Sequence, residues 1–147
     1  MYKRILVATD GTDLSQKAVD QAIALAGVCK SELLIVKIVP RYPQTYFEGA
    51  MSLTQEDAER IEETWAQQSK TTVDAAVAQA SAAGVTAVGK VIKSDVVSDA
   101  LIETSKAEHA DLIVMASHGR KGISRMLLGS ETQQVLTHSS TPVLVLR

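Results

Sequence analysis

The sequence contains little of several residue types that mark specialised classes of protein. One cysteine, Cys29, among 147 residues excludes an internal disulfide, and no Cys/His cluster has the spacing of metal ligands. The aromatic residues are one Trp, one Phe and three Tyr, which is a poor supply for stacking a flavin or single-stranded nucleic acid. A net charge of −2 lacks the basic excess of general nucleic-acid or membrane-surface binders.

Long apolar runs are also missing. None approaches the roughly 20 residues that a membrane-spanning helix needs. The first residues, MYKRILVATD, lead directly into a short strand-like run whose length and flanks differ from those of a signal peptide. With a single cysteine and no targeting segment, we expect a protein of the reducing cytoplasm that neither enters a membrane nor binds nucleic acid.

What the sequence does contain is a regular alternation of short apolar runs and helical patterns. A helix between consecutive strands makes the strands parallel, with right-handed crossovers. We therefore predict an α/β fold, an open doubly wound sheet of five parallel strands with helices on both faces. No linker or repeat interrupts it, so residues 1–147 are expected to form one domain. The predicted strands are 5–9, 32–39, 86–93, 110–117 and 142–147.

Four helices are predicted between these strands. The second is long, with Ala83-Gly84 as its glycine C-cap, and the third is expected to be capped by Ser94 or Asp95. Residues 40–54, with two prolines and three of the aromatics, are interpreted as an irregular surface connection. The other predicted helices are 14–29, 96–106 and 130–137.

Sheets of this kind bind ligands beyond the carboxyl ends of their strands, where the strand order reverses. The candidate loops are 10–13, after the first strand, and 116–119, after the fourth. Gly119 would permit a positive φ and close approach of a ligand. Gly129 and Ser130 open a helix and offer amide donors, a hydroxyl and the positive end of the helix dipole. Together these residues predict an anion site, although the glycines could equally serve ordinary turns and a cap.

The loop between the two glycines is basic and contains no acidic residue: it holds Arg120, Lys121 and Arg125. Familiar phosphate motifs are nevertheless absent from the sequence, since neither GxxxxGK[ST] nor GxGxxG occurs. A receiver domain would need a phosphorylatable aspartate after the third strand, where Asp95 follows as a helix cap.

The whole chain resembles the universal stress proteins of the single-domain bacterial type. The resemblance is carried by RILVATDGTDLS, DLIVMASHGRKGISRMLLGSETQQVL and TPVLVLR. The nucleotide-binding branch of that family has the pattern G-x2-G-x9-G-[ST], which here becomes Ala116, Gly119 and Gly129-Ser130. The resemblance implies an adenine nucleotide alpha hydrolase-like fold and an ATP site, and leaves Mg²⁺ open as a companion of the nucleotide.

Residue by residue, the resemblance places adenine near Asp10 and Ile38. Met115 and the turn from Ala116 through His118 to Gly119 would border the ribose and phosphates. Phosphate would be bound by Gly119, Gly129 and Ser130, with a further contact from Thr132.

Two departures from the family pattern bear on nucleotide binding. Ala116 replaces a glycine, and a positive φ there would cost alanine about 1 kcal/mol. Glu131 puts a carboxylate beside the phosphate position, where it would repel a triphosphate if it pointed inward. The alternative function is therefore a family member without nucleotide that acts as a dimeric protein-interaction scaffold.

Catalysis and assembly complete the expectations. Ser117 and His118 could form a nucleophile and base, but adjacent turn residues usually point apart and no third group is evident to orient the imidazole. We expect ATP hydrolysis to be slow at most.

The last strand, 142–147, is apolar and should form a sheet edge, which predicts a homodimer through this edge. The identity of other protein partners stays open.

Overall fold

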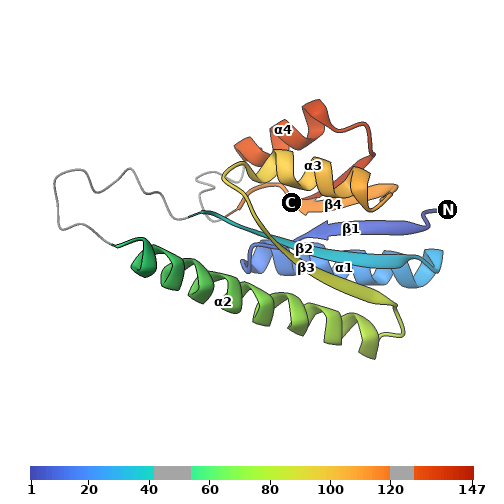
Figure 1. Ribbon diagram of the computed structural model, residues 1–147. Coiled ribbons are helices and arrows are strands. Elements are labelled where there is room, and N and C mark those ends of the chain that lie inside the picture. Colours follow the sequence, from blue (N-terminus) through green and yellow to red (C-terminus); the bar gives the residue numbers. More distant parts are fainter. Residues whose placement is uncertain (42–53, 120–127) are drawn as a thin grey trace.

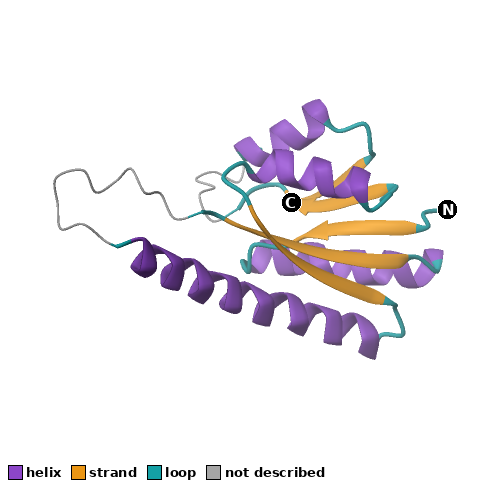
Figure 2. Cartoon of the chain, in the orientation of Figure 1, coloured by secondary structure: helices purple, strands orange, loops and turns teal. Residues whose placement is uncertain are grey.

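The computed structural model describes residues 1–41, 54–119 and 128–147. It is a five-stranded parallel sheet with the strand order β3-β2-β1-β4-β5 and helices on both faces (Figures 1 and 2). The predicted fold class is confirmed. The strands are β1 (Arg4–Ala8), β2 (Glu32–Val39), β3 (Ala87–Lys93), β4 (Leu112–Ala116) and β5 (Val143–Leu146). The helices are α1 (Asp13–Cys29), α2 (Gln55–Ala82), α3 (Val97–Ala107) and α4 (Ser130–His138).

The alternating side chains of the central strands divide the core into two clusters, one on each face of the sheet. Ile5 and Val7 of β1 pack with residues of α1 and α2, whereas Leu6 between them packs with residues of α3 and α4. All three are fully buried. Because both faces are covered there, the central strands β1 and β4 contain continuous apolar runs, and this is why they could be located from the sequence.

The strand order reverses at β1, which pairs with β2 on one side and β4 on the other. The turn after β1 and the turn after β4 therefore lie next to each other at the carboxyl edge of the sheet. This is the switch point at which the sequence placed the two candidate loops, and the structure confirms their adjacency.

The ends of two helices were predicted from the sequence, one wrongly and one correctly. The expected cap of α3 by Ser94 or Asp95 is wrong: the N-cap is Val96, which makes no side-chain capping bond. Ser94 lies two positions before the N-cap, and its Oγ accepts the amide of Val96 itself at 3.2 Å. The predicted glycine at the end of α2 is confirmed, since Gly84 has φ +80°.

At the opposite, amino edge, charged side chains tie the strands to the end of α3. Arg4 forms ion pairs with Glu32 at 2.6 Å and with Glu108 at 3.5 Å, and Lys90 of β3 also pairs with Glu108. The hydrogen bond from Lys90, together with the positive charges of Lys90 and Arg4, lowers the pKa of Glu108. Within the described residues, no helix is long and apolar enough to cross a membrane.

Candidate functional site

The turn after β1 holds the Asp10 carboxylate in a fixed orientation. Asp10 Oδ1 accepts the amide of Thr12 at 2.9 Å and the hydroxyl of Thr12 at 2.5 Å. Thr12 is itself the N-cap of α1, accepting the amide of Ser15 at 3.3 Å. Aspartate is a favoured residue in turns, and threonine is a favoured residue at helix N-caps. The start of α1 thus fixes an acidic group at the carboxyl edge of the sheet.

Gly119 lies directly against this carboxylate. A Cβ added at Gly119 would stand 2.8 Å from Asp10 Oδ2, closer than a methyl group and an oxygen can approach. Of the two reasons predicted for this glycine, the positive φ is wrong, since among the described glycines only Gly11 and Gly84 have positive φ. A side chain at position 119 would have to displace the Asp10 carboxylate, because two turns that are 109 residues apart in the chain meet here.

Gly129 brings the start of α4 against the turn after β4. Its amide donates to Ser117 O at 2.7 Å, and its φ of −62° is available to any residue. A Cβ at this position would lie 3.2 Å from His118 Cα and 3.3 Å from Ser117 O. The absent side chain therefore lets the helix start pack on the turn backbone. The amides in the first turn of α4, which begins at Ser130, have no acceptor within the helix because of helix geometry.

Ser130 and Glu131 interact with each other at this helix start. Ser130 Oγ donates to Glu131 Oε2 at 3.2 Å. Ser130 is exposed, so its hydroxyl can turn to another acceptor, while the Glu131 carboxylate is partly buried and stands in the first turn of α4. A carboxylate suits the positive end of the helix dipole when no other anion is present.

Thr132 connects α4 to the end of β4. Its side chain is 2% exposed, and its hydroxyl donates to Ala116 O at 2.9 Å. Ala116 is the last residue of β4 and pairs with Leu146 of β5. It is not among the described residues with positive φ, so the conformational penalty expected for alanine at this position is wrong. In an extended strand, alanine is as acceptable as glycine.

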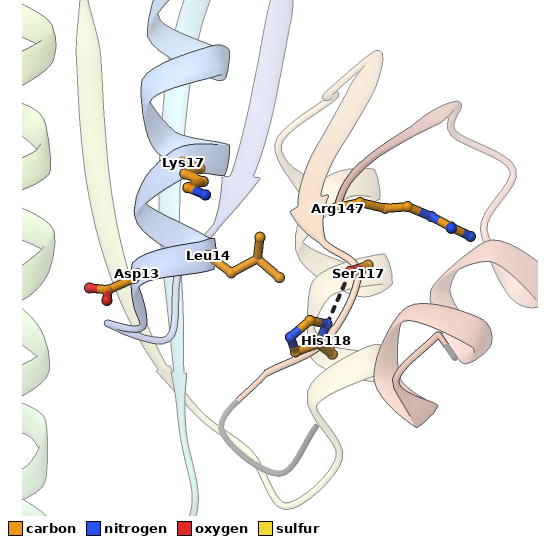
Figure 3. A pocket seen from close by; sticks show the side chains of 6 residues that line it. All are labelled: Asp13, Leu14, Lys17, Ser117, His118 and Arg147. Carbon is orange, nitrogen blue, oxygen red and sulfur yellow. Dashed lines mark hydrogen bonds between the residues drawn. The ribbon is translucent and has the colours of Figure 1, made fainter. Parts of the chain in front are cut away.

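Ser117 and His118 were expected to point apart, and this is also wrong. Ser117 Oγ and His118 Nδ1 form a hydrogen bond of 3.1 Å. The two side chains face an open pocket of about 430 Å³ on the α1 side of the turn (Figure 3). Sequence analysis missed this pocket because its other walls come from distant segments. Its remaining lining residues are Asp13, Leu14, Lys17 and Arg147.

Ile38 and Met115 are the two apolar residues of the predicted site. Met115 is 6% exposed and belongs to the core cluster on the α3–α4 face, against which Ile38 packs as a partly buried residue. The register that pairs Ala8 with Val36 places Ile38 level with Asp10 at the carboxyl edge. Ile38 can therefore offer an apolar surface beside Asp10, whereas the side chain of Met115 is turned into the core.

The structure thus brings together Asp10 with Gly119, and Gly129-Ser130 with the turn 116–118. Among the described residues, no group of three or more His, Cys, Asp or Glu could hold a metal ion. The basic residues expected near the phosphates lie outside the described residues. They are Arg120, Lys121 and Arg125.

Comparison with known proteins identifies the relatives of this fold. The model of the universal stress protein family matches residues 1–147. A universal stress protein of Thermus aquaticus is 32% identical over the full length of both chains. The solved structure of universal stress protein UspA from Lactobacillus plantarum has a TM-score of 0.86 at 21% identity and covers 99% of this chain and 98% of its own.

Another solved structure, a universal stress protein in complex with cAMP, is 28% identical, with a TM-score of 0.71 over 99% of this chain and 97% of that one. The family match and the Thermus relative both extend over all the segments that form the carboxyl edge. The chain belongs to the universal stress protein family.

Proposed function

We propose that this protein binds an adenine nucleotide, with ATP as the principal candidate, at the carboxyl edge of the sheet. The observation that carries the proposal is the pair of close approaches at Gly119 and Gly129, where a Cβ would meet Asp10 and the backbone of residues 117–118. Because of these approaches, the oriented carboxylate of Asp10 and the amino end of α4 lie around the turn after β4. The 28% identical relative whose structure contains cAMP supports an adenine nucleotide as the ligand.

Each part of the proposed site has a chemical role that its geometry permits. The Asp10 carboxylate can accept a hydrogen bond from the amino group of adenine, beside the apolar surface of Ile38. The amides that begin α4 and the hydroxyl of Ser130 can donate to phosphate oxygens. Thr132 acts through its bond to Ala116, which holds α4 against β4.

We assign the protein a role in stress response or signalling through nucleotide binding, with ATP hydrolysis slow at most. The Nδ1 atom of His118 is engaged by Ser117, and Ser117 is only 5% exposed. A nucleophile with this little access is poorly placed to attack a phosphate held at the start of α4. Holding or sensing the nucleotide fits this arrangement better than turnover.

The proposed site is tested by comparing Gly129→Ala with Gly27→Ala in calorimetric titrations of ATP. A Cβ at Gly129 would crowd His118, whereas a Cβ at Gly27 would make an ordinary contact of 3.9 Å with Val85. Gly129→Ala should weaken ATP binding roughly tenfold or more, and Gly27→Ala should leave it unchanged. Equal affinity in both variants would place the nucleotide elsewhere.

A second function is favoured by one observation, the Glu131 carboxylate at the start of α4. A negative charge there would oppose a triphosphate, and a family member without nucleotide could act as a dimeric scaffold for other proteins. Glu131→Gln separates the two functions. If ATP binds only after this substitution, the carboxylate excludes the nucleotide and the scaffold function is the better description.

We also propose that the protein forms a homodimer through β5. This strand lies at one edge of the sheet, and its four residues are all apolar. The other edge strand, β3, contains Lys90 and Lys93. Charged residues, and lysine above all, are a common protection of an edge against pairing with another chain. The edge at β5 lacks this protection. A twofold pairing of β5 with its copy would provide hydrogen-bond partners for the unpaired backbone groups of this edge.

Leu144→Lys and Val88→Lys form a matched pair for this test, because each puts lysine on an exposed valine or leucine of an edge strand. Leu144 of β5 is 41% exposed and Val88 of β3 is 56% exposed. Light scattering should find a dimer for the parent and for Val88→Lys, and a shift toward monomer for Leu144→Lys. A monomeric parent, or a Leu144→Lys variant that stays fully dimeric, would exclude β5 as the interface.

A further inference from the structure

The pocket beside Ser117 and His118 contains a lysine to which the proposed nucleotide site gives no role. It opens between the first turns of α1 and the turn after β4 (Figure 3). Figure 3 shows Leu14 extending from α1 toward His118, and Asp13 and Lys17 of the same helix also line the pocket. Arg147 lines the pocket too, but its side chain extends away from Lys17.

Lys17 is available to an anion in this pocket. Among the ion pairs and hydrogen bonds of the described residues, none involves Lys17, although Asp13 precedes it by four positions on the same helix. A spacing of four commonly pairs opposite charges on a helix surface. Lys17 instead lines the pocket together with Ser117 and His118 of the turn after β4.

The pocket adjoins the proposed phosphate position through a single residue. His118 lines the pocket with its side chain, while its Cα lies 3.2 Å from the position that a Cβ of Gly129 would take. The start of α4 and the pocket therefore flank the same residue. A polyphosphate bound at the start of α4 can continue past this residue, and a pocket of about 430 Å³ has room for further phosphates.

We propose that Lys17 contacts the terminal phosphates of the bound nucleotide and makes the site prefer a nucleoside triphosphate over a monophosphate. This inference rests on the proposed nucleotide site and adds to it a specificity-determining residue on α1. Lysine is well suited to the role, because its ammonium is a compact charge that can follow a phosphate without fixed geometry. A monophosphate held at Gly129-Ser130 would not extend into the pocket and would not sense Lys17.

The test measures ATP and AMP affinities for the parent, Lys17→Gln, Lys17→Arg and the control Lys106→Gln. Lys106 is exposed in the last turn of α3, at the amino edge of the sheet, so its replacement makes the same change in net charge far from the site. Glutamine has a helix propensity close to that of lysine. Thermal unfolding without nucleotide should therefore be nearly the same for all four proteins.

We expect Lys17→Gln to weaken ATP binding about five- to tenfold, the size of one partly screened charge contact, with AMP affinity unchanged. Lys17→Arg should retain most of the preference for ATP, and Lys106→Gln all of it. Unchanged ATP affinity in Lys17→Gln, or equal losses for ATP and AMP, would overturn the role of Lys17 while leaving the nucleotide site intact. Failure of the parent to bind either nucleotide would overturn the site and the role together.

Discussion

Gly89, in the middle of β3, provides the sharpest test of how α2 packs on the sheet. A Cβ at this position would lie 2.1 Å from Val73 Cγ1 on α2. Carbon atoms in contact are normally about 3.5–4.0 Å apart, so the overlap is more than about 1 Å. Val73 is only 2% exposed, and a valine in a helix has one strongly preferred rotamer. The strain of Gly89→Ala therefore has to be absorbed by moving the helix or the strand.

Overpacking of this kind costs about 1–3 kcal/mol, and the severity of the overlap places Gly89→Ala near the upper end. For a domain of this size, the melting temperature should fall by about 5–10 °C. Urea unfolding followed by circular dichroism gives the free energy directly. Gly27→Ala, in helix α1, is the control. Its added Cβ would make an ordinary contact of 3.9 Å with Val85, so this substitution should be neutral or stabilising.

A double substitution shows whether the contact itself causes the loss. With Val73→Ala, the atom nearest to a Cβ at position 89 becomes Val77 Cγ2 at 3.2 Å, and the Cβ of residue 73 lies at 3.6 Å, an ordinary contact. Gly89→Ala should therefore cost less in the Val73→Ala background, with a coupling of about 1 kcal/mol or more. A Gly89→Ala variant as stable as the parent, or the same cost in both backgrounds, would refute the packing described between α2 and β3.

Three further predictions follow from single contacts. Ala116→Gly should leave ATP affinity within about twofold of the parent, since Ala116 lies in an extended strand with no positive φ; a clear gain in titration would show that its methyl group obstructs the ligand. Thr132→Val should lower the free energy of unfolding by about 1 kcal/mol through loss of the bond to Ala116 O, and Thr132→Ser should largely preserve it. The lowered pKa of Glu108, due first to its hydrogen bond from Lys90, stabilises the fold above the ordinary carboxyl pKa, and this contribution is lost as the pH falls through the lowered value. Acid unfolding should therefore be less steep in Glu108→Gln, and identical pH profiles would contradict the assignment.

The elements that could be predicted from the sequence are those whose signal is local. β2 was predicted with its observed bounds, Glu32–Val39, because its apolar residues, interrupted only by Lys37, are typical of a strand buried on both faces. The cap of α3 was mispredicted because Ser94 is a favoured capping residue by type, yet its hydroxyl bonds to the amide of Val96, the cap residue itself. The preference of serine for capping positions does not show whether its hydroxyl will bond an amide of the first helical turn or the amide of a residue just before it.

The site was predictable in its location but not in its reasons. The switch point follows from topology, and the residues at Asp10, Gly119 and Gly129 follow from the family resemblance. The close approach of Gly119 to Asp10 joins two turns that are 109 residues apart, and no local sequence pattern contains that contact. The same holds for the pocket at Lys17, whose walls come from α1 and from the ends of β4 and β5.

The most direct test of nucleotide binding at the carboxyl edge is an NMR titration of the parent protein with ATP, followed at its glycine amides. Gly119 and Gly129 lie at the proposed phosphate position, whereas Gly27 and Gly84 lie at the far ends of α1 and α2. We predict that the amide signals of Gly119 and Gly129 shift progressively to saturation, while those of Gly27 and Gly84 stay in place. Unmoved signals at Gly119 and Gly129 in the presence of excess ATP, or shifts confined to Gly27 and Gly84, would contradict the proposed site.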